Sequence, residues 1–307
     1  MKGLVQKTLS LAPGGVRVNE MLQRSVGSFR RFDAEVTGKI EDFRLMARQL
    51  RTAGVPIEGA RFLEIGSASY PTLPVCLYLV GAERVHTIDR VRRLQLDLLR
   101  KLVVRLEREI PSIAEAAGAY AGVCEAKRAH LRASLSTGAT LHDASESCID
   151  YRAPADPTAT ELPQHAVDVV FSNSMLEHFP LVTLDKIFAE SWRVLRPGGV
   201  VFHSVNCGDH YAYTDPSVGQ LHYLQYSERQ WRLLWNNDLQ YQNRLRAIDF
   251  INLARKHDFE IVRDTTKVDP ARLAELRALP RVAREFRGYS PEELCVTTVD
   301  FVARKVP

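Results

Sequence analysis

The chain has 307 residues, of which 45% are hydrophobic and 25% charged, and its net charge of +4 is small for this length, as in an ordinary globular protein. No apolar run approaches the ~18–20 residues that span a bilayer, and the N-terminus lacks the apolar core of a signal peptide, so we expect a cytoplasmic protein. The five cysteines form no CxxC pair, which favours free thiols over a disulfide framework or a zinc cluster.

The apolar runs predict strands and helices in alternation after an N-terminal helical segment. Charged and apolar residues mix over 17–53 without a strand-like run, so this part is predicted to be helical. Short buried strands are predicted at 61–65, 84–88, 148–151, 167–171, 200–205, 260–262 and 295–303. Helices are predicted at 74–80, 92–109, 184–195, 243–257 and 270–286, with one helix and a loop over 111–147. This alternation predicts a doubly wound, mostly parallel α/β sheet with ligands at the carboxyl ends of its strands.

The first strand ends in a sharp turn of small residues that would let a ligand approach the backbone. Glu64 lies near the end of the strand, and Gly66 can adopt a positive φ and carries no side chain. Asp89 ends the second strand, where its carboxylate can accept hydrogen bonds from ribose hydroxyls. A dinucleotide site would need G-x-G-x-x-G around a pyrophosphate, whereas an acidic Glu64 suits a cationic cofactor. These residues favour S-adenosylmethionine over NAD.

Four segments, in their order and spacing, resemble the successive motifs of class I S-adenosylmethionine-dependent methyltransferases. They are E-I-G-S-A-S from Glu64, T-I-D up to Asp89, V-D-V-V-F-S-N-S-M-L-E-H-F from Val167 and W-R-V-L-R-P-G-G-V-V from Trp192. The likeness covers roughly residues 59–206, with a looser match towards the C-terminus. It implies a Rossmann-like, seven-stranded sheet whose last strand is antiparallel, S-adenosyl-L-methionine as the cofactor, and methyl transfer as the activity.

Carried over by position, the resemblance assigns a set of cofactor-binding residues. Glu64, Gly66 and Ala68 would line the methionine part of the cofactor, with Ala68 standing where the family has its second glycine. Asp89 would bind the ribose and Asp156 the adenine amino group, with Asp143 as the competing candidate. The whole set, whose last two members would lie near the sulfonium, is Glu64, Gly66, Ser67, Ala68, Asp89, Arg90, Asp156, Asn173 and Ser174.

Two histidines follow strands at the same edge of the predicted sheet, and either could act as a general base toward a hydroxyl acceptor. His178 follows the fourth strand, while His210 follows the fifth with Asp209 beside it. The catalytic candidates are therefore His210, His178 and Asp209. Asp209, His210, Asp215 and His222 could also hold a divalent metal, but their spacing matches no strong metal motif, so no metal is expected.

The chain is expected to divide into an N-terminal helical cap and a methyltransferase domain. We place the cap at 1–58 and the domain at 59–307, with insertions at about 110–147 and 208–242. The second insertion follows the fifth strand and is rich in Tyr, Trp, His and Gln. It would therefore cover the site as a lid.

The expected acceptor is a small polar molecule, methylated on a hydroxyl. Aromatic faces in the second insertion and donors in Asn243-Arg244-Leu-Arg246 would suit a sugar or a similar metabolite. Trp231 and Trp235, four apart on a predicted helix, are expected to pack into the core instead.

Other functions stay open at this point. They are methylation of nitrogen or carbon in a metabolite, and a catalytically silent binding module that keeps the fold. A nicotinamide-dependent oxidoreductase is disfavoured by the missing glycines. Nucleic acid is not an expected partner, because the residues after the fourth strand lack the proline-aromatic clamp used on flipped bases. The oligomeric state is not predicted.

Overall fold

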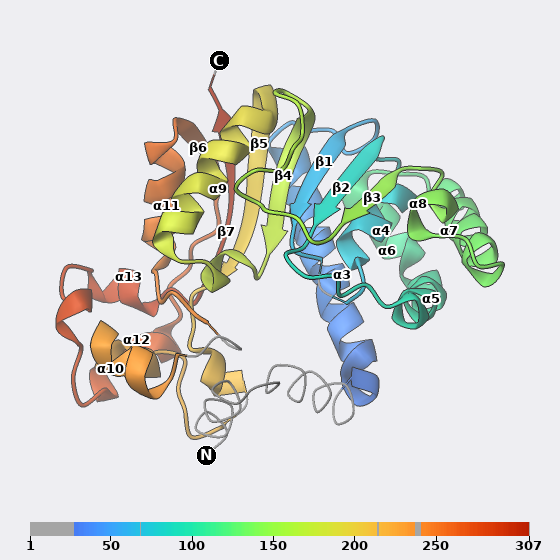
Figure 1. The fold of residues 1–307 in the computed structure, drawn as a ribbon. Helices are drawn as coiled ribbons and strands as arrows, with labels where there is room; N and C mark the ends of the chain where they lie inside the picture. Colours follow the sequence, from blue (N-terminus) through green and yellow to red (C-terminus); the bar gives the residue numbers. More distant parts are fainter. Residues whose placement is uncertain (1–27, 68, 214, 237–240, 307) are drawn as a thin grey trace.

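The computed structural model describes residues 28–67, 69–213, 215–236 and 241–306, which are built around one seven-stranded sheet (Figure 1). The strands are β1 (Arg61–Ile65), β2 (Arg84–Ile88), β3 (Ile149–Arg152), β4 (Val167–Asn173), β5 (Leu195–Asn206), β6 (Phe259–Asp264) and β7 (Thr298–Lys305). Their order is β3-β2-β1-β4-β5-β7-β6, and every pairing is parallel except those of β7 with β5 and β6. The predicted fold class is confirmed, including the antiparallel last strand.

Helices cover both faces of the sheet, and successive strand residues alternate between two hydrophobic cores. Phe171 and Phe202 point into the core on one face, while Val170 and Val201 point into the core on the other. Both faces are thus buried, as a doubly wound sheet requires. The first face carries α3 (Ser28–Thr52), α4 (Thr72–Leu79), α5 (Leu96–Arg105), α6 (Ile110–Ala117), α7 (Ala121–Ser136) and α8 (Leu141–Ala144), and the second carries α9 (Leu181–Val194) and α11 (Ala247–Lys256).

Residues 111–147 differ from the prediction of one helix and a loop, because α6, α7 and α8 all lie there. Gly118 ends α6 with a φ of +72°, and Gly138 follows α7 with a φ of +92°, both in the left-handed region that stops a helix. In the predicted N-terminal helical segment, α3 begins at Ser28, and residues 17–27 lie outside the described part of the chain. The cap boundary at residue 58 stays a prediction.

A second layer of structure lies at the carboxyl edge of the sheet, where the arrowheads of β4 and β5 point in Figure 1. It is built from α10 (Glu228–Leu234), α12 (Pro270–Ala278) and α13 (Pro291–Cys295), together with short 3-10 turns. Tyr223 and Trp231 from the segment after β5 share a small hydrophobic core with Phe286 and Leu294 from the β6–β7 connection. We call these two segments, 207–236 and 265–297, the lid. The lid therefore includes a segment that the sequence analysis did not assign to it.

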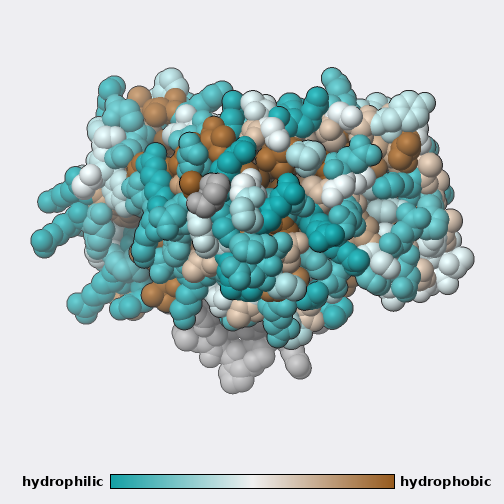
Figure 2. Space-filling model, turned by 90° about the horizontal axis from the view of Figure 1, so that it is seen from above, coloured by the Kyte–Doolittle hydropathy of each residue, from teal (hydrophilic) through white to brown (hydrophobic). Residues whose placement is uncertain are grey.

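The opposite, amino edge of the sheet faces the viewer in Figure 2, which looks down on Figure 1 from above. Hydrophilic residues dominate this face, and hydrophobic residues form only small, separate spots on it. Among the helices that the structure describes, none is long and apolar enough to cross a membrane.

Candidate active site

The turn after β1 brings Glu64 and Gly66 to the carboxyl edge of the sheet. Glu64 is buried and accepts hydrogen bonds from the hydroxyls of Ser67 and of Thr87, the latter at 2.5 Å. Burial raises the pKa of Glu64 to about 7, against the lowering effect of these hydroxyls. Gly66 has a φ of +87°, and a Cβ there would lie 2.7 Å from the Sδ atom of Met175. The turn therefore requires glycine; the neighbouring Ala68 lies outside the described residues.

Asp89, at the end of β2, lies beside a cavity of 540 Å³. Its backbone accepts a hydrogen bond from Ala155 N at 2.9 Å, which ties the loop after β3 to the end of β2. Arg90 and Asp156 both line the cavity, and two hydrogen bonds from Thr158 lower the pKa of the Asp156 carboxyl. The competing candidate, Asp143, lies on α8 before β3 and therefore at the opposite edge. The structure thus brings Asp156, and not Asp143, to Asp89 and Arg90.

The end of β4 meets a lysine that the sequence analysis did not identify. Asn173 is buried, and its side-chain oxygen accepts a hydrogen bond from Lys39 Nζ on α3. Asp42, one turn further along α3, lies 3.8 Å from the same ammonium. Ser174 follows with a φ of +50°, an uncommon conformation for a residue with a side chain that is enriched at functional sites. Helix α3 therefore contributes charged groups to this edge of the sheet.

Glu177, His178 and His210 form a cluster beside the end of β4. The rings of His178 and His210 are in edge-to-face contact, with centroids 5.1 Å apart, and His210 Nε2 lies 4.0 Å from Glu177 Oε1. Burial raises the pKa of Glu177 to about 8 and lowers that of His210 to about 4. At neutral pH the Glu177 carboxyl is therefore protonated, and the His210 ring is neutral. His210 Nε2 is buried and has no hydrogen-bond partner within the described chain.

His178 has a defined tautomer, because its Nδ1 lies 2.8 Å from the carbonyl oxygen of Tyr241. A carbonyl only accepts hydrogen bonds, so Nδ1 carries the hydrogen and Nε2 carries the lone pair of the neutral ring. Burial also lowers the pKa of His178, which favours the neutral ring. Two neutral imidazoles and a protonated carboxyl thus meet at this point. Glu177 was missed because it stands inside a motif that was interpreted only through His178.

Asp209 does not orient His210, although the two are adjacent in the sequence. Its carboxylate is fully buried and contacts His222 Nδ1 at 2.9 Å and the backbone amide of Tyr211 at 2.8 Å. The side chain of Asp215 accepts hydrogen bonds from Ser217 and does not contact Asp209 or His222. The four residues considered for a metal therefore do not converge. In the part of the chain that the structure describes, no group of three or more His, Cys, Asp or Glu side chains could hold a metal ion.

The polar residues just before α11 do not face an acceptor. This differs from the interpretation of Asn243-Arg244-Leu-Arg246 as donors for a sugar. Asn243 donates to the carbonyl oxygens of Leu176 and Phe179, both at 2.9 Å. Arg244 and Arg246 are buried and donate to carbonyl groups inside the lid. Trp231 is buried and stacks on Trp235, as expected from their spacing. Arg244 and Arg246 therefore hold the lid together, whereas Asn243 ties the segment before α11 to the residues after β4.

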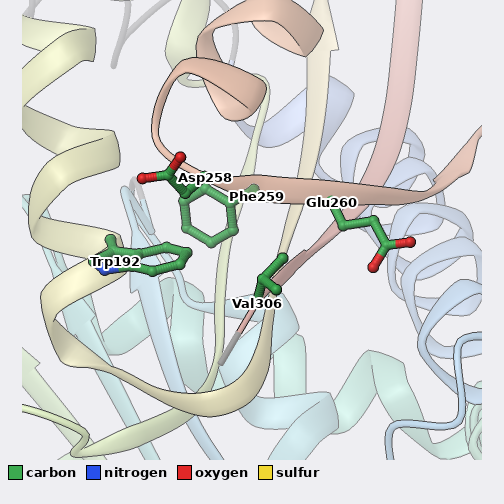
Figure 3. A pocket seen from close by; sticks show the side chains of 5 residues that line it. All are labelled: Trp192, Asp258, Phe259, Glu260 and Val306. Carbon is green, nitrogen blue, oxygen red and sulfur yellow. The ribbon is translucent and has the colours of Figure 1, made fainter.

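Another cavity, of 480 Å³, lies at the amino edge, away from all of these residues (Figure 3). It is lined by Trp192, whose ring meets Phe259 edge to face at 5.2 Å, and by Asp258, Glu260 and Val306. Phe259 begins β6, and Val306 follows the end of the antiparallel β7. Because ligands of a doubly wound sheet bind at the carboxyl edge, we do not assign this cavity to the active site.

Replacing Glu177 with Gln is expected to change how stability depends on pH. A carboxyl whose pKa rises from 4.5 to about 8 on folding binds a proton in the folded state, so its contribution to stability is lost as pH rises from 4.5 to 8. Glu177→Gln removes this loss, so between pH 5 and pH 8.5 the free energy of unfolding of the variant should rise by about 4 kcal/mol relative to that of the wild type. Urea unfolding at both pH values measures it. The exposed Glu115→Gln is the control, and an equal difference at both pH values would contradict the assignment.

Part of the chain matches the model of a known protein family. A family model described as a methyltransferase domain matches residues 120–203. No curated protein matches the chain. Among solved structures, the chain resembles an S-adenosylmethionine-dependent methyltransferase from Mesorhizobium loti, at 16% identity over 83% of this chain and 95% of the other, with a TM-score of 0.44. It also resembles a SAM-dependent methyltransferase from Methanosarcina mazei (13% identity, 81% and 93% covered, TM-score 0.44) and geranyl diphosphate methyltransferase in complex with SAM (14% identity, 92% and 92% covered, TM-score 0.47).

Proposed function

We propose that this chain, which is a class I S-adenosylmethionine-dependent methyltransferase, methylates a hydroxyl group of a small polar acceptor with His210 as the general base. The proposal rests on the state of His210. Its ring is neutral above about pH 4, and its Nε2 atom is buried and has no hydrogen-bond partner among the described residues. A hydroxyl loses its proton when it is methylated, so a neutral imidazole beside the acceptor has a direct use.

The residues at the carboxyl edge fit the cofactor chemically. When bound, S-adenosylmethionine supplies a methyl group on a positively charged sulfonium, next to the positively charged amine of its amino-acid end. Glu64 offers a carboxyl oxygen at the end of β1, and Gly66 supplies the positive-φ turn that follows it. Asp89 would accept hydrogen bonds from the ribose hydroxyls, and Arg90 and Asp156 would line the adenine pocket. Asn173 and Ser174 would border the sulfonium from the end of β4.

Proton transfer would run from the acceptor hydroxyl to His210 Nε2. The acceptor oxygen would take the methyl group while the bond between the methyl carbon and the cofactor sulfur breaks, with S-adenosylhomocysteine as the leaving group. The proton of the hydroxyl would pass to the imidazole, which would later release it to solvent. His178 would border the acceptor with the lone pair of its Nε2 and could accept a second hydrogen bond. Asp209 would act at a distance, by holding the part of the lid around His210 through its contacts with Tyr211 and His222.

The acceptor side of the site is polar and partly aromatic. Tyr213 is exposed, its ring lies 6.1 Å from that of His210, and its hydroxyl accepts a hydrogen bond from Asn206 at 2.8 Å. An aromatic face beside amide and imidazole groups suits a polyhydroxylated molecule, so we propose a sugar hydroxyl as the first acceptor class to test. Sugars and simple amines, offered with methyl-labelled cofactor, separate oxygen from nitrogen methylation. Label transferred only to amines would reject the proposal.

His210→Gln is expected to reduce kcat by about 10²- to 10⁴-fold, because glutamine keeps a polar side chain but cannot take up the proton. Binding of S-adenosylhomocysteine should not change. In the wild type, kcat at saturating cofactor should stay level from pH 7.5 to pH 5.5, since burial lowers the pKa of His210 to about 4. The exposed His130→Gln is the control. An acid limb near pH 6.5, or an unchanged kcat in His210→Gln, would exclude His210 as the base.

A further inference from the structure

Lys39 lies on α3, far from the methyltransferase motifs in the sequence, yet its side chain reaches the carboxyl edge of the sheet. Its ammonium donates a hydrogen bond to Asn173 Oδ1 at the end of β4. Its charge partly opposes the rise that burial causes in the pKa values of Glu64 and Glu177, so it lies close enough to interact with the end of β1 and with the segment after β4. Lys39 therefore faces the space where the amino-acid end of the cofactor would lie.

The charge of Lys39 is only loosely compensated in the structure. Asn173 is a neutral amide, and Asp42 lies 3.8 Å away, beyond the length of a good charge-assisted hydrogen bond. Burial raises the pKa of Asp42 against the lowering effects of Lys39 and of a hydrogen bond with Asn173, and this net rise disfavours the charged form. The ammonium is partly buried and can accept an anion as an additional partner.

The cofactor carries one such anion, the carboxylate of its methionine part. Glu64 suits the amine of that part, but a carboxylate beside the buried Glu64 needs a positive group close to it. Arg90 lines the cavity that we propose for the adenine, so it would lie away from the methionine end. We propose that Lys39 binds a carboxylate and that the methionine end of the cofactor supplies it, an inference that rests on the cofactor residues proposed above. Helix α3 then forms part of the cofactor site and is more than a covering helix.

The test compares two ligands that differ only in the carboxylate. S-adenosylhomocysteine carries it, whereas its decarboxylated analogue, S-adenosyl-3-thiopropylamine, keeps the amine and lacks the acid. Calorimetric titration of Lys39→Met should show about 10- to 100-fold weaker binding of S-adenosylhomocysteine, the usual effect of losing a charge-assisted hydrogen bond. Binding of the decarboxylated analogue should stay the same or strengthen. Lys39→Arg should recover part of the loss.

Arg48→Met is the matched control, since it removes one positive charge from an exposed position on the same helix. Thermal unfolding of each variant checks that α3 stays folded. If Lys39→Met weakens both ligands equally, or neither, the inference is wrong: Lys39 then acts structurally or serves a carboxylate of the acceptor. If the wild type binds neither ligand, the proposed cofactor residues fail first, and the inference fails with them.

Discussion

Asp89→Ala is expected to weaken the binding of S-adenosylhomocysteine by at least about 100-fold. Asp89 is buried at the end of β2, where its backbone pairs with Arg152 and Ala155 and holds the side chain in place. Two ribose hydroxyls donating to one carboxylate would each contribute about 1.5–3 kcal/mol, because the acceptor is charged. The sum corresponds to two or more powers of ten in affinity. Calorimetric titration of both proteins measures it directly.

Two further variants make this result specific. Asp89→Asn keeps the shape of the side chain but loses the charge and one acceptor, so its affinity should fall between those of the wild type and Asp89→Ala. Asp97→Ala removes an exposed carboxylate from α5 and should leave binding unchanged. Equal affinities for the wild type and Asp89→Ala would show that the ribose does not bind at the end of β2. The other assignments at this edge would then need to be revised.

The strands and the cofactor edge could be predicted from the sequence because their signals are local. Each buried strand appears as a short apolar run, since both faces of the sheet are covered. Glu64 and Asp89 end neighbouring parallel strands, and parallel strands bring their carboxyl ends to the same edge. Their placement at that edge therefore follows once the order of strands is known, and the structure agrees.

Side-chain partners from distant parts of the chain could not be predicted in this way. Lys39 lies 134 residues before Asn173, and nothing in the mixed charge pattern of α3 marks it as different from its neighbours. Asp209 and His210 are adjacent in sequence, yet their side chains contact different partners, because backbone conformation decides which way each one points. Arg244 and Arg246 were interpreted as ligand donors, because the sequence alone does not distinguish a buried arginine from one at the surface.

Arg246 shows how much the lid depends on one such buried arginine. It is fully buried at the start of α11 and donates to the carbonyl oxygens of Cys207 after β5 and Leu294 before β7, at 2.7 and 3.0 Å. It also donates to the hydroxyl of Tyr223 and the carbonyl oxygen of Val296. The guanidinium thus joins both segments of the lid to the end of the sheet, and its loss leaves several buried acceptors without a donor.

Arg246→Met is therefore expected to destabilise the protein by about 2–4 kcal/mol, because unpaired buried acceptors cost about 1–3 kcal/mol each while removal of a buried charge gives part of this back. The midpoint of thermal unfolding should fall by roughly 5–10 °C. Arg255→Met, an exposed change on the same helix, should shift it by less than about 2 °C. A shift as small as that in Arg246→Met would mean that the lid is held by its hydrophobic core alone. Because His210 belongs to the lid, Arg246→Met should also lower kcat more than it lowers the affinity for S-adenosylhomocysteine.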